Sequence, residues 1–147
     1  MEKLTPVGLN WLIREWDKIS ETLHRTLGSG SAFILRYIGM GIGKGYAEII
    51  KSYELTFHES LQFLREYFIK RALGKLNFSE IKVENVSGRV AIQETSLRNP
   101  YSRYILYGII VGFLEEVTEK KIHVREIKNE FPALIEAKFR LTGGEIK

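Results

Sequence analysis

The chain has 147 residues, of which 44% are hydrophobic, and it carries a formal net charge of +4. A chain of this length buries enough apolar surface to fold as one domain without cross-links. It contains no cysteine, which excludes disulfide bonds, zinc sites built on thiolates and cysteine nucleophiles.

The first predicted element is a helix. Thr5 and Pro6 form its start, with threonine as the N-cap and proline in the first turn. Apolar residues at helical spacing then place one face against the core. These positions are Leu9, Leu12, Ile13, Trp16, Ile19 and Leu23. The sequence GSGS at 28–31 is expected to end this helix.

Two further helices are expected next. One runs from about residue 32 to residue 53, and the other begins at Thr56 or His58 and is closed by Gly74. The third helix has the clearest apolar periodicity of the chain. Its apolar stripe consists of Leu61, Leu64, Tyr67, Phe68, Ala72 and Leu73.

The period then changes from helical spacing to strict alternation, which predicts strands. A strand that contains Ile81 and Val83 is expected to turn at Ser87-Gly88 into a second strand that contains Val90. These two strands read as a hairpin.

A fourth helix opens at Asn99-Pro100 and is apolar on every side over residues 104–114. A helix that is apolar all round is buried, and eleven residues are too few to cross a membrane. Two more alternating segments follow, at about 121–128 and 133–141, and predict a second hairpin.

This order of elements predicts an α+β fold in which helices pack on a four-stranded antiparallel sheet. The two hairpins of the sheet are separated in the sequence by the buried helix. Because no repeat and no long linker divides the chain, residues 1–147 are expected to form a single domain.

The stretch YIGMGIGKG at 37–45 holds glycine at every second position, from Gly39 to Gly45. It matches neither the P-loop nor the dinucleotide-binding pattern, because other residues stand at required positions. In a helix, Gly39 and Gly43 share one side, whereas Gly41 and Gly45 share another. Each glycine inside a helix costs about 1 kcal/mol relative to alanine, so a close approach to these glycines is expected.

The same spacing recurs in Gly108 and Gly112 on the buried helix. Either the two glycine-bearing helices pack directly against each other, or they leave room for a ligand, and the sequence leaves both alternatives open. On the first of these helices, Lys44 and Glu48 are expected to form an i,i+4 ion pair.

Candidate catalytic residues are scarce. His24, His58 and His123 lie on different elements, and none has a ligand-type partner at metal-binding spacing. No Gly-x-Ser-x-Gly motif is present, and the only aspartate is Asp17. We therefore predict no catalytic residue, no metal site and no cofactor, and the sequence leaves open whether the protein is an enzyme.

The charged residues are mostly glutamate, lysine and arginine, a bias that is typical of heat-adapted proteins. Cations are interspersed with glutamates along the chain, which favours a solvated surface over nucleic-acid binding. The sequence shows no signal peptide and no run of 18 apolar residues. We therefore expect a cytoplasmic protein without a membrane span.

Four segments together resemble the 4-vinyl reductase (hydrocarbon-binding) domain, which is similar in fold to the Bet-type subunits of the TRAPP complex and to haem-nitric-oxide-binding domains. The segments are YIGMGIGKGYAEII, GRVAIQETSL, YILYGIIVGFLEEV and EIKNEFPALIEAKF. The resemblance covers residues 32–142 and leaves the helix in 1–28 outside. It implies a domain, commonly dimeric, that encloses a hydrophobic small molecule, in some relatives a tetrapyrrole or hydrocarbon-like ligand.

The last segment departs from the family pattern. Glu126 and Phe139 match it, but Asn129 and Ala137 stand where the family has cysteines, and Ala133 stands for a glycine. Any metal or thiol chemistry that relatives carry at those positions is therefore absent here.

From the residues and the resemblance together, we expect a non-enzymatic domain that binds or senses a hydrophobic small molecule, in a pocket between the two glycine-bearing helices and the sheet. A buried tyrosine hydroxyl needs a polar partner, which suits such a pocket. The residues expected to line it are Tyr37, Gly41, Tyr46, Tyr104, Tyr107 and Gly108. The alternative is a homodimeric scaffold or adaptor in which the glycines only serve helix packing.

Overall fold

The computed structural model describes residues 6–142, and their side chains from residue 13 onward. The helices are α1 (Pro6–Leu27), α2 (Ser31–Ile50), α3 (Phe57–Lys70) and α4 (Arg103–Thr118), with short 3-10 turns η1 (Gly28–Gly30), η2 (Lys51–Tyr53) and η3 (Pro100–Ser102). The strands are β1 (Lys75–Lys82), β2 (Ser87–Gln93), β3 (Ile122–Glu130) and β4 (Leu134–Leu141). Thr5 lies outside the described residues, as do the side chains of Leu9 and Leu12.

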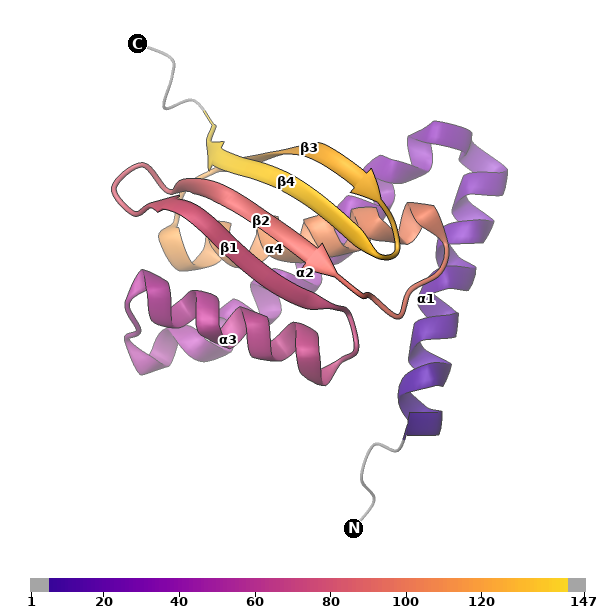
Figure 1. Ribbon diagram of the computed structural model, residues 1–147, viewed down its shortest axis with the longest axis horizontal. Helices are drawn as coiled ribbons and strands as arrows, with labels where there is room; N and C mark the ends of the chain where they lie inside the picture. Colours follow the sequence, from indigo (N-terminus) through magenta and orange to yellow (C-terminus); the bar gives the residue numbers. More distant parts are fainter. Residues whose placement is uncertain (1–5, 143–147) are drawn as a thin grey trace.

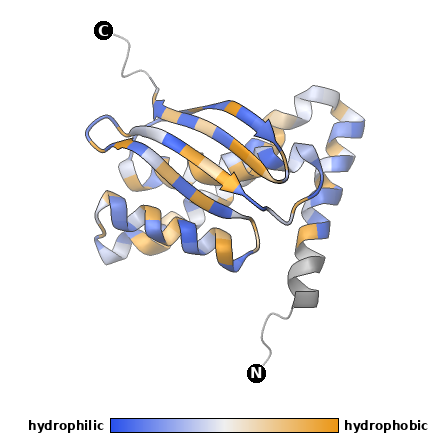
Figure 2. Cartoon of the chain, in the orientation of Figure 1, coloured by the Kyte–Doolittle hydropathy of each residue, from blue (hydrophilic) through white to orange (hydrophobic). Residues whose placement is uncertain are grey.

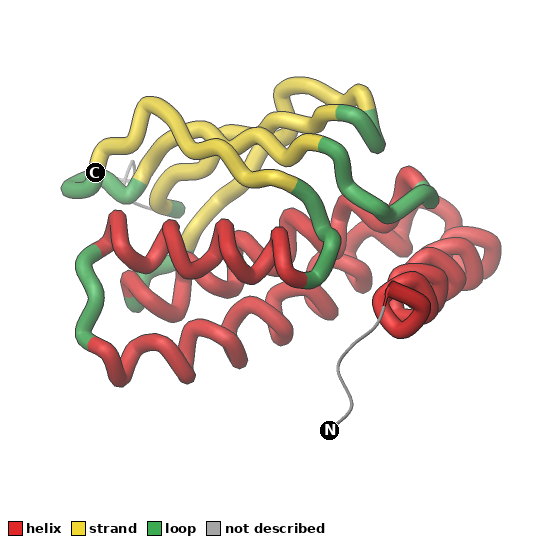
Figure 3. The backbone as a smooth tube through the Cα atoms, turned by 60° about the horizontal axis from the view of Figure 1, so that its bottom comes forward, coloured by secondary structure: helices red, strands yellow, loops and turns green. Residues whose placement is uncertain are grey.

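The four strands form one antiparallel sheet in the order β1-β2-β4-β3. The helices cover one face of this sheet and leave the other face open (Figures 1 and 3). Helix α4 lies against the sheet, α2 packs on α4 from outside, and α1 stands beside the sheet near η3. The predicted α+β fold with a four-stranded antiparallel sheet is confirmed.

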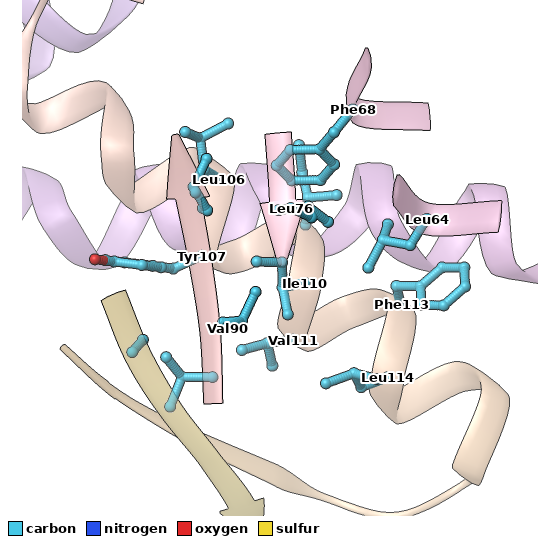
Figure 4. Packing of buried hydrophobic residues seen from close by; sticks show 14 of the residues in the cluster. Leu64, Phe68, Leu76, Val90, Leu106, Tyr107, Ile110, Val111, Phe113 and Leu114 are labelled. Atoms are coloured by element: carbon cyan, nitrogen blue, oxygen red, sulfur yellow. The ribbon is translucent and has the colours of Figure 1, made fainter. Parts of the chain in front are cut away.

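Helix α4 forms the centre of the molecule. Its residues from Ile105 to Glu115 are all buried, as the apolar run on every side predicted. Alternating side chains of the strands point toward it, and this alternation is visible along the sheet in Figure 2. Figure 4 shows Val90 and Leu76 from the strands and Phe68 from α3 packed around α4. Within residues 6–142, no helix combines the length and apolarity needed to cross a membrane.

The start of α3 is set by a capping box. The hydroxyl of Thr56 accepts from the backbone N–H of Glu59, and the carboxylate of Glu59 accepts from the backbone N–H of Thr56. Of the two predicted starts, Thr56 is therefore the N-cap. The helix ends at Lys70, before the expected Gly74, which instead leads into β1 with a positive φ of 130°.

The first hairpin turns earlier than predicted. Ser87 and Gly88 lie within β2, and residues 83–86 form the turn. The register shifts between Ser79 and Lys82, where Glu80 adopts a left-handed backbone conformation. Because this irregularity interrupts the alternation of β1, the sequence pattern placed the turn at the wrong residues.

Helices α2 and α4 are in direct backbone contact. A Cβ added at Gly39 would overlap the carbonyl oxygen of Ile105, and one added at Gly43 would overlap that of Ile109. Only glycine fits at these two positions, because the α4 backbone occupies the space that a side chain would need.

The contact is reciprocal. A Cβ at Gly108 would overlap the carbonyl oxygen of Arg36, and one at Gly112 would overlap that of Met40. Of the two alternatives that the sequence left open for these glycines, the structure has direct helix packing, and the two backbones leave no room for a ligand along this contact.

The expected pair between Lys44 and Glu48 is replaced by an ion pair between helices. The Nζ of Lys44 lies 3.5 Å from Oε1 of Glu115 on α4, whose side chain is only 8% exposed. The other oxygen of Glu115 accepts from the backbone N–H of Ile122 at 3.1 Å. Lys44 thus compensates a buried carboxylate, which local spacing along α2 could not reveal.

Candidate functional site

A surface cleft of about 610 Å³ lies between α2 and α3. Its lining residues are Tyr46, Gln62, Phe63, Glu66, Tyr67, Lys70 and Arg71. All but Tyr46 come from α3 or the residue that follows it, and they form two columns with a spacing of four. One column is polar and exposed and consists of Gln62, Glu66 and Lys70. The other consists of Phe63, Tyr67 and Arg71, and its two aromatic rings are half-buried. A four-residue spacing keeps each column on one side of a helix.

The aromatic wall of the cleft is held by specific contacts. The ring centroids of Tyr46 and Tyr67 lie 4.5 Å apart. The hydroxyl of Tyr46 donates to the backbone carbonyl of Phe63 at 3.2 Å. The guanidinium carbon of Arg71 lies 4.5 Å from the ring centroid of Tyr67, which is a cation–π contact. The wall is therefore ordered, with a cation placed directly beside it.

Both tyrosines of the wall remain neutral over the physiological range. Burial raises the pKa of Tyr46, and burial raises the pKa of Tyr67 against the opposing effect of Arg71. The phenolate form is disfavoured because the rings are partly removed from water. The wall therefore presents an uncharged aromatic surface, and the formal charges at the cleft come from Glu66, Lys70 and Arg71.

A second cluster lies where the first turn of α4 meets β3. The guanidinium of Arg103 donates to the carboxylate of Glu126 at 2.8 Å, and Tyr107 donates to the same oxygen at 2.6 Å. Arg103 also donates to the hydroxyl of Tyr104 at 3.0 Å and lies over its ring. Burial, followed by the hydrogen bond to Glu126, raises the pKa of Tyr107 far above its ordinary value. The groups of this cluster satisfy one another, which is typical of a structural network.

The structure does not bring the six predicted pocket residues together. Tyr46 lines the cleft, whereas Tyr37 and Gly41 lie on the exposed side of α2. Two others, Tyr104 and Tyr107, belong to the Arg103 cluster.

The sixth residue, Gly108, lies in the α2–α4 contact. The cleft residues on α3 were missed because Tyr67 was assigned to an apolar core stripe. The spacing of four that joins Phe63, Tyr67 and Arg71 is the signal that could have identified this wall.

The only aspartate docks α1 onto the turn that opens α4. The carboxylate of Asp17 accepts from the backbone N–H groups of Arg98 and Asn99 at 2.8 and 3.1 Å. It also accepts from the hydroxyl of Ser102 at 2.7 Å. These contacts give Asp17 a structural role. Within residues 6–142, no group of three or more metal-ligand side chains could hold an ion.

Comparison with known proteins gives matches at the level of structure alone. No protein-family model matches the chain, and no curated protein matches it at a significant level. TRAPP complex subunit 3 from Naegleria fowleri, covalently bound to palmitic acid, has a TM-score of 0.72 at 15% identity, covering 94% of this chain and 97% of that one. The phenol-responsive sensory domain of the transcription activator PoxR, with phenol, has a TM-score of 0.69 at 13% identity, covering 87% and 74%.

Two further matches have lower scores. A vinyl-4-reductase family protein from Methanocaldococcus jannaschii has a TM-score of 0.55 at 18% identity, covering 97% of each chain. An H-NOX structure has a TM-score of 0.54 at 13% identity, covering 96% of this chain and 75% of that one. The expected relationship in fold to TRAPP subunits, vinyl reductases and H-NOX domains is confirmed. At these identities, membership of the 4-vinyl reductase family stays a prediction.

Proposed function

We propose that this protein is a non-enzymatic domain that binds or senses a small hydrophobic molecule, and that the ligand occupies the cleft between α2 and α3. The observation that carries the proposal is the ordered aromatic wall of Tyr46 and Tyr67 at a cleft of about 610 Å³. Ligand pockets for small molecules commonly have volumes of 300–1,000 Å³ and aromatic linings.

The fold supports this proposal independently of the cleft. Two structures that share it were solved with small molecules, palmitic acid in a TRAPP subunit and phenol in a sensory domain. Both ligands combine an apolar body with one oxygen-bearing end. Fold alone does not establish function, so the proposed function of this chain rests on the residues of its cleft.

The charges at the cleft favour a ligand with an acidic end. Lys70 and Arg71 stand beside the aromatic wall, and among the described residues Glu66 is the only carboxylate of the lining. A carboxylate on the ligand can accept two parallel hydrogen bonds from a guanidinium, which is a charge-assisted interaction. We therefore propose an aromatic or aliphatic acid, with its apolar part on Tyr67 and its carboxylate on Arg71.

Calorimetric titration with two matched compounds tests this proposal. The probes are 4-phenylbutyrate and 4-phenylbutan-1-ol, which differ in the charged end alone. We expect saturable binding of the acid below about 1 mM and weaker binding of the alcohol. The variant Arg71→Gln should weaken acid binding about tenfold, equivalent to about 1.4 kcal/mol, and leave alcohol binding unchanged.

The control is Arg25→Gln, which removes the same charge from the exposed end of α1 and should leave both affinities unchanged. The variant Tyr67→Leu should weaken binding of both compounds, because it removes the aromatic platform. Saturable binding of neither compound, or equal effects of the Arg71 and Arg25 substitutions, would contradict the proposal.

A second candidate function is that of a homodimeric scaffold or adaptor without a ligand. It is supported by the large apolar side chains that α2 exposes, including Phe33 and Tyr37 at 69% and 65%. Such patches mark interaction surfaces in many proteins. A pure scaffold should bind neither probe and should still assemble in solution, so the titration separates the two functions.

A further inference from the structure

The side of the sheet that no helix covers carries mainly cations. Figure 1 is seen from this side, with the strands in front of α4. Because side chains alternate along a strand, residues that pair across the sheet share a face. At the paired positions, the lysine and arginine residues of the open side are Lys75, Lys82, Arg89, Arg125, Lys128, Lys138 and Arg140, and the carboxylates are Glu130 and Glu136. The whole chain has a net charge of +4, so its positive charge is concentrated here.

Cations stand directly opposite one another on this side. Arg89 on β2 is opposite Lys138 on β4, and Lys138 is opposite Arg125 on β3. In the next row, Arg140 on β4 is opposite His123 on β3. We call these five residues the basic face. Like charges that face each other across a sheet are destabilising, so the first row costs stability in the free protein.

Ion pairs within the chain are found at one end of the first row. Arg89 lies 3.3 Å from Glu80 and 3.5 Å from Glu136. Within residues 6–142, neither Lys138 nor Arg125 has an ion pair, and both side chains are exposed. Edge strands commonly carry lysine as a protection against aggregation, but β2 and β4 are the central strands of this sheet. A bound anion would relieve the repulsion within the row.

The sheet separates charges that are mixed along the chain. Cations and glutamates are interspersed in the sequence, which predicts a solvated surface. In β3, however, Arg125 lies on the open side, whereas the next residue, Glu126, points inward and accepts from Tyr107 on α4 at 2.6 Å. The alternation of the strand thus directs the glutamate toward the core and leaves the cation outside. This segregation arises from the fold and is not visible in the order of residues.

The open side offers hydrogen-bond donors and no apolar anchor. A shallow hollow of about 240 Å³ beside Arg89 is lined in part by Asn77 and Ser79. Among the described residues, no large hydrophobic side chain that is exposed lies on a strand. Membrane insertion and tight protein interfaces use apolar or aromatic side chains, and proteins that bind single strands stack the bases on aromatic rings. Arginine, lysine, serine and asparagine are the side chains that contact the phosphates and sugars of a duplex.

The dimensions of the basic face also fit a duplex. Neighbouring strands of a sheet are about 4.8 Å apart, so the row from Arg89 to Arg125 spans about 10 Å. One strand of a DNA duplex presents about three phosphates over that length of the helix axis. The second row adds a further contact, so we expect the basic face to neutralise about four phosphates.

We propose that the basic face binds double-stranded nucleic acid through its phosphates, without reading the base sequence. This site is separate from the proposed ligand cleft, which lies between α2 and α3 on the helical side of the sheet. Substitutions on the basic face should therefore leave binding of 4-phenylbutyrate unchanged.

Fluorescence anisotropy with a labelled DNA duplex of about 20 base pairs tests the proposal. In about 100 mM salt we expect a dissociation constant of about 10 µM, within the range of binding that does not depend on sequence. Because four phosphate contacts release counterions, binding should weaken about a hundredfold between about 50 and 200 mM salt. A second duplex of unrelated sequence should bind equally well.

Two variants of the basic face and one matched control locate the site. Arg125→Glu should raise the dissociation constant at least tenfold. Arg65→Glu makes the same change of charge at an exposed position of α3, on the covered side of the sheet, and should change it by less than about twofold. Lys138→Glu should also weaken binding at least tenfold. Because it places a carboxylate between Arg89 and Arg125, it should at the same time raise the midpoint of urea denaturation, which separates lost binding from lost folding.

Three results of the titration would overturn the proposal: no saturable binding in about 50 mM salt, equal effects of Arg125→Glu and Arg65→Glu, or tighter binding of a single strand than of the duplex. Competition separates the duplex from other polyanions. Poly-L-glutamate and vesicles that contain phosphatidylserine, each added at the same total charge as the duplex, should not displace it. Displacement by poly-L-glutamate would assign the face to an acidic protein segment, displacement by vesicles would assign it to a membrane, and either result would overturn the proposal.

Discussion

Tyr107 combines a buried ring with a hydroxyl that is hydrogen-bonded to a charged group. Its ring is 1% exposed, and its hydroxyl donates to Glu126, which Arg103 also contacts. In Figure 4 the hydroxyl points away from the apolar cluster, so that the ring packs in the core while the oxygen reaches a polar partner. Replacing this tyrosine by phenylalanine keeps the packing and removes the hydrogen bond.

The hydrogen bond between Tyr107 and Glu126 should contribute to stability. The variant Tyr107→Phe should lower the free energy of unfolding by about 1.5 kcal/mol. This value is the low end for a hydrogen bond to a charged group, because Glu126 retains its ion pair with Arg103 in the variant. Urea denaturation at pH 7 measures the change. An unchanged midpoint would contradict the assigned role of the hydroxyl.

Three tyrosines should make the stability of the protein depend on pH in the alkaline range. The pKa values of Tyr107, Tyr46 and Tyr67 are higher in the folded protein than the ordinary value, so folding favours their neutral forms. This stability is fully present below a pH of about 10, the ordinary tyrosine pKa, and is lost as the pH rises above it. Stability should therefore fall in alkali, and it should fall less steeply in Tyr107→Phe than in the wild type.

At the scale of elements, two glycine-to-alanine variants of α2 form a matched pair that tests the contact between α2 and α4. The variant Gly43→Ala places a methyl group on the carbonyl oxygen of Ile109 and should cost about 3 kcal/mol, since the backbone must move apart. The variant Gly45→Ala, two residues along the same helix, meets no atom and should be neutral or gain up to about 1 kcal/mol from helix propensity. Urea denaturation of both variants checks this. Equal effects would contradict the finding that Gly43, and not Gly45, lies against the α4 backbone.

The docking of α1 should depend on the carboxylate of Asp17. The variant Asp17→Ala leaves the backbone N–H groups of Arg98 and Asn99 and the hydroxyl of Ser102 without their acceptor. It should destabilise the protein by about 2 kcal/mol. Hydrogen exchange should quicken in α1 and at η3, while rates in β1–β4 stay as in the wild type. Uniform quickening throughout the chain would show that Asp17 does more than anchor this helix.

Sequence patterns predicted the elements that depend on local signals. The apolar run at 104–114 indicated a buried helix, and the alternation at 133–141 indicated a strand, because both patterns extend over enough residues to be distinctive. The turn of the first hairpin was placed wrongly because the backbone irregularity at Glu80 breaks the period of two.

Contacts between residues that lie far apart in the chain could not be predicted from the sequence. Lys44 has a carboxylate four residues away in the sequence, yet its partner is Glu115 on another helix. Likewise, Phe63 and Tyr67 have the spacing of core residues, and only the position of α2 shows that they border a cleft. The four alternating glycines differ in the same way, since Gly39 and Gly43 are required by α4, which lies about 70 residues further along the chain, whereas Gly41 and Gly45 are not.

At the scale of the whole molecule, the homodimeric alternative predicts that thermal stability depends on protein concentration. A hundredfold rise in wild-type concentration should raise the melting temperature by about 4 °C, because dissociation accompanies unfolding. The variant Ile49→Glu places a charge among the apolar side chains that α2 exposes, so its melting temperature should not change over the same range. Scanning calorimetry or fluorescence melting across that range provides the measurement.

Binding of a hydrophobic acid in the cleft between α2 and α3 is the basis of the proposed function. Titration of ¹⁵N-labelled protein with 4-phenylbutyrate, followed by NMR, tests it most directly. The predicted result is saturable shifts that cluster at the amides of Tyr46, Phe63, Tyr67 and Arg71, with the Tyr107 and Glu126 amides unchanged. The absence of saturable shifts, or shifts confined to Tyr107 and Glu126, would contradict the claim.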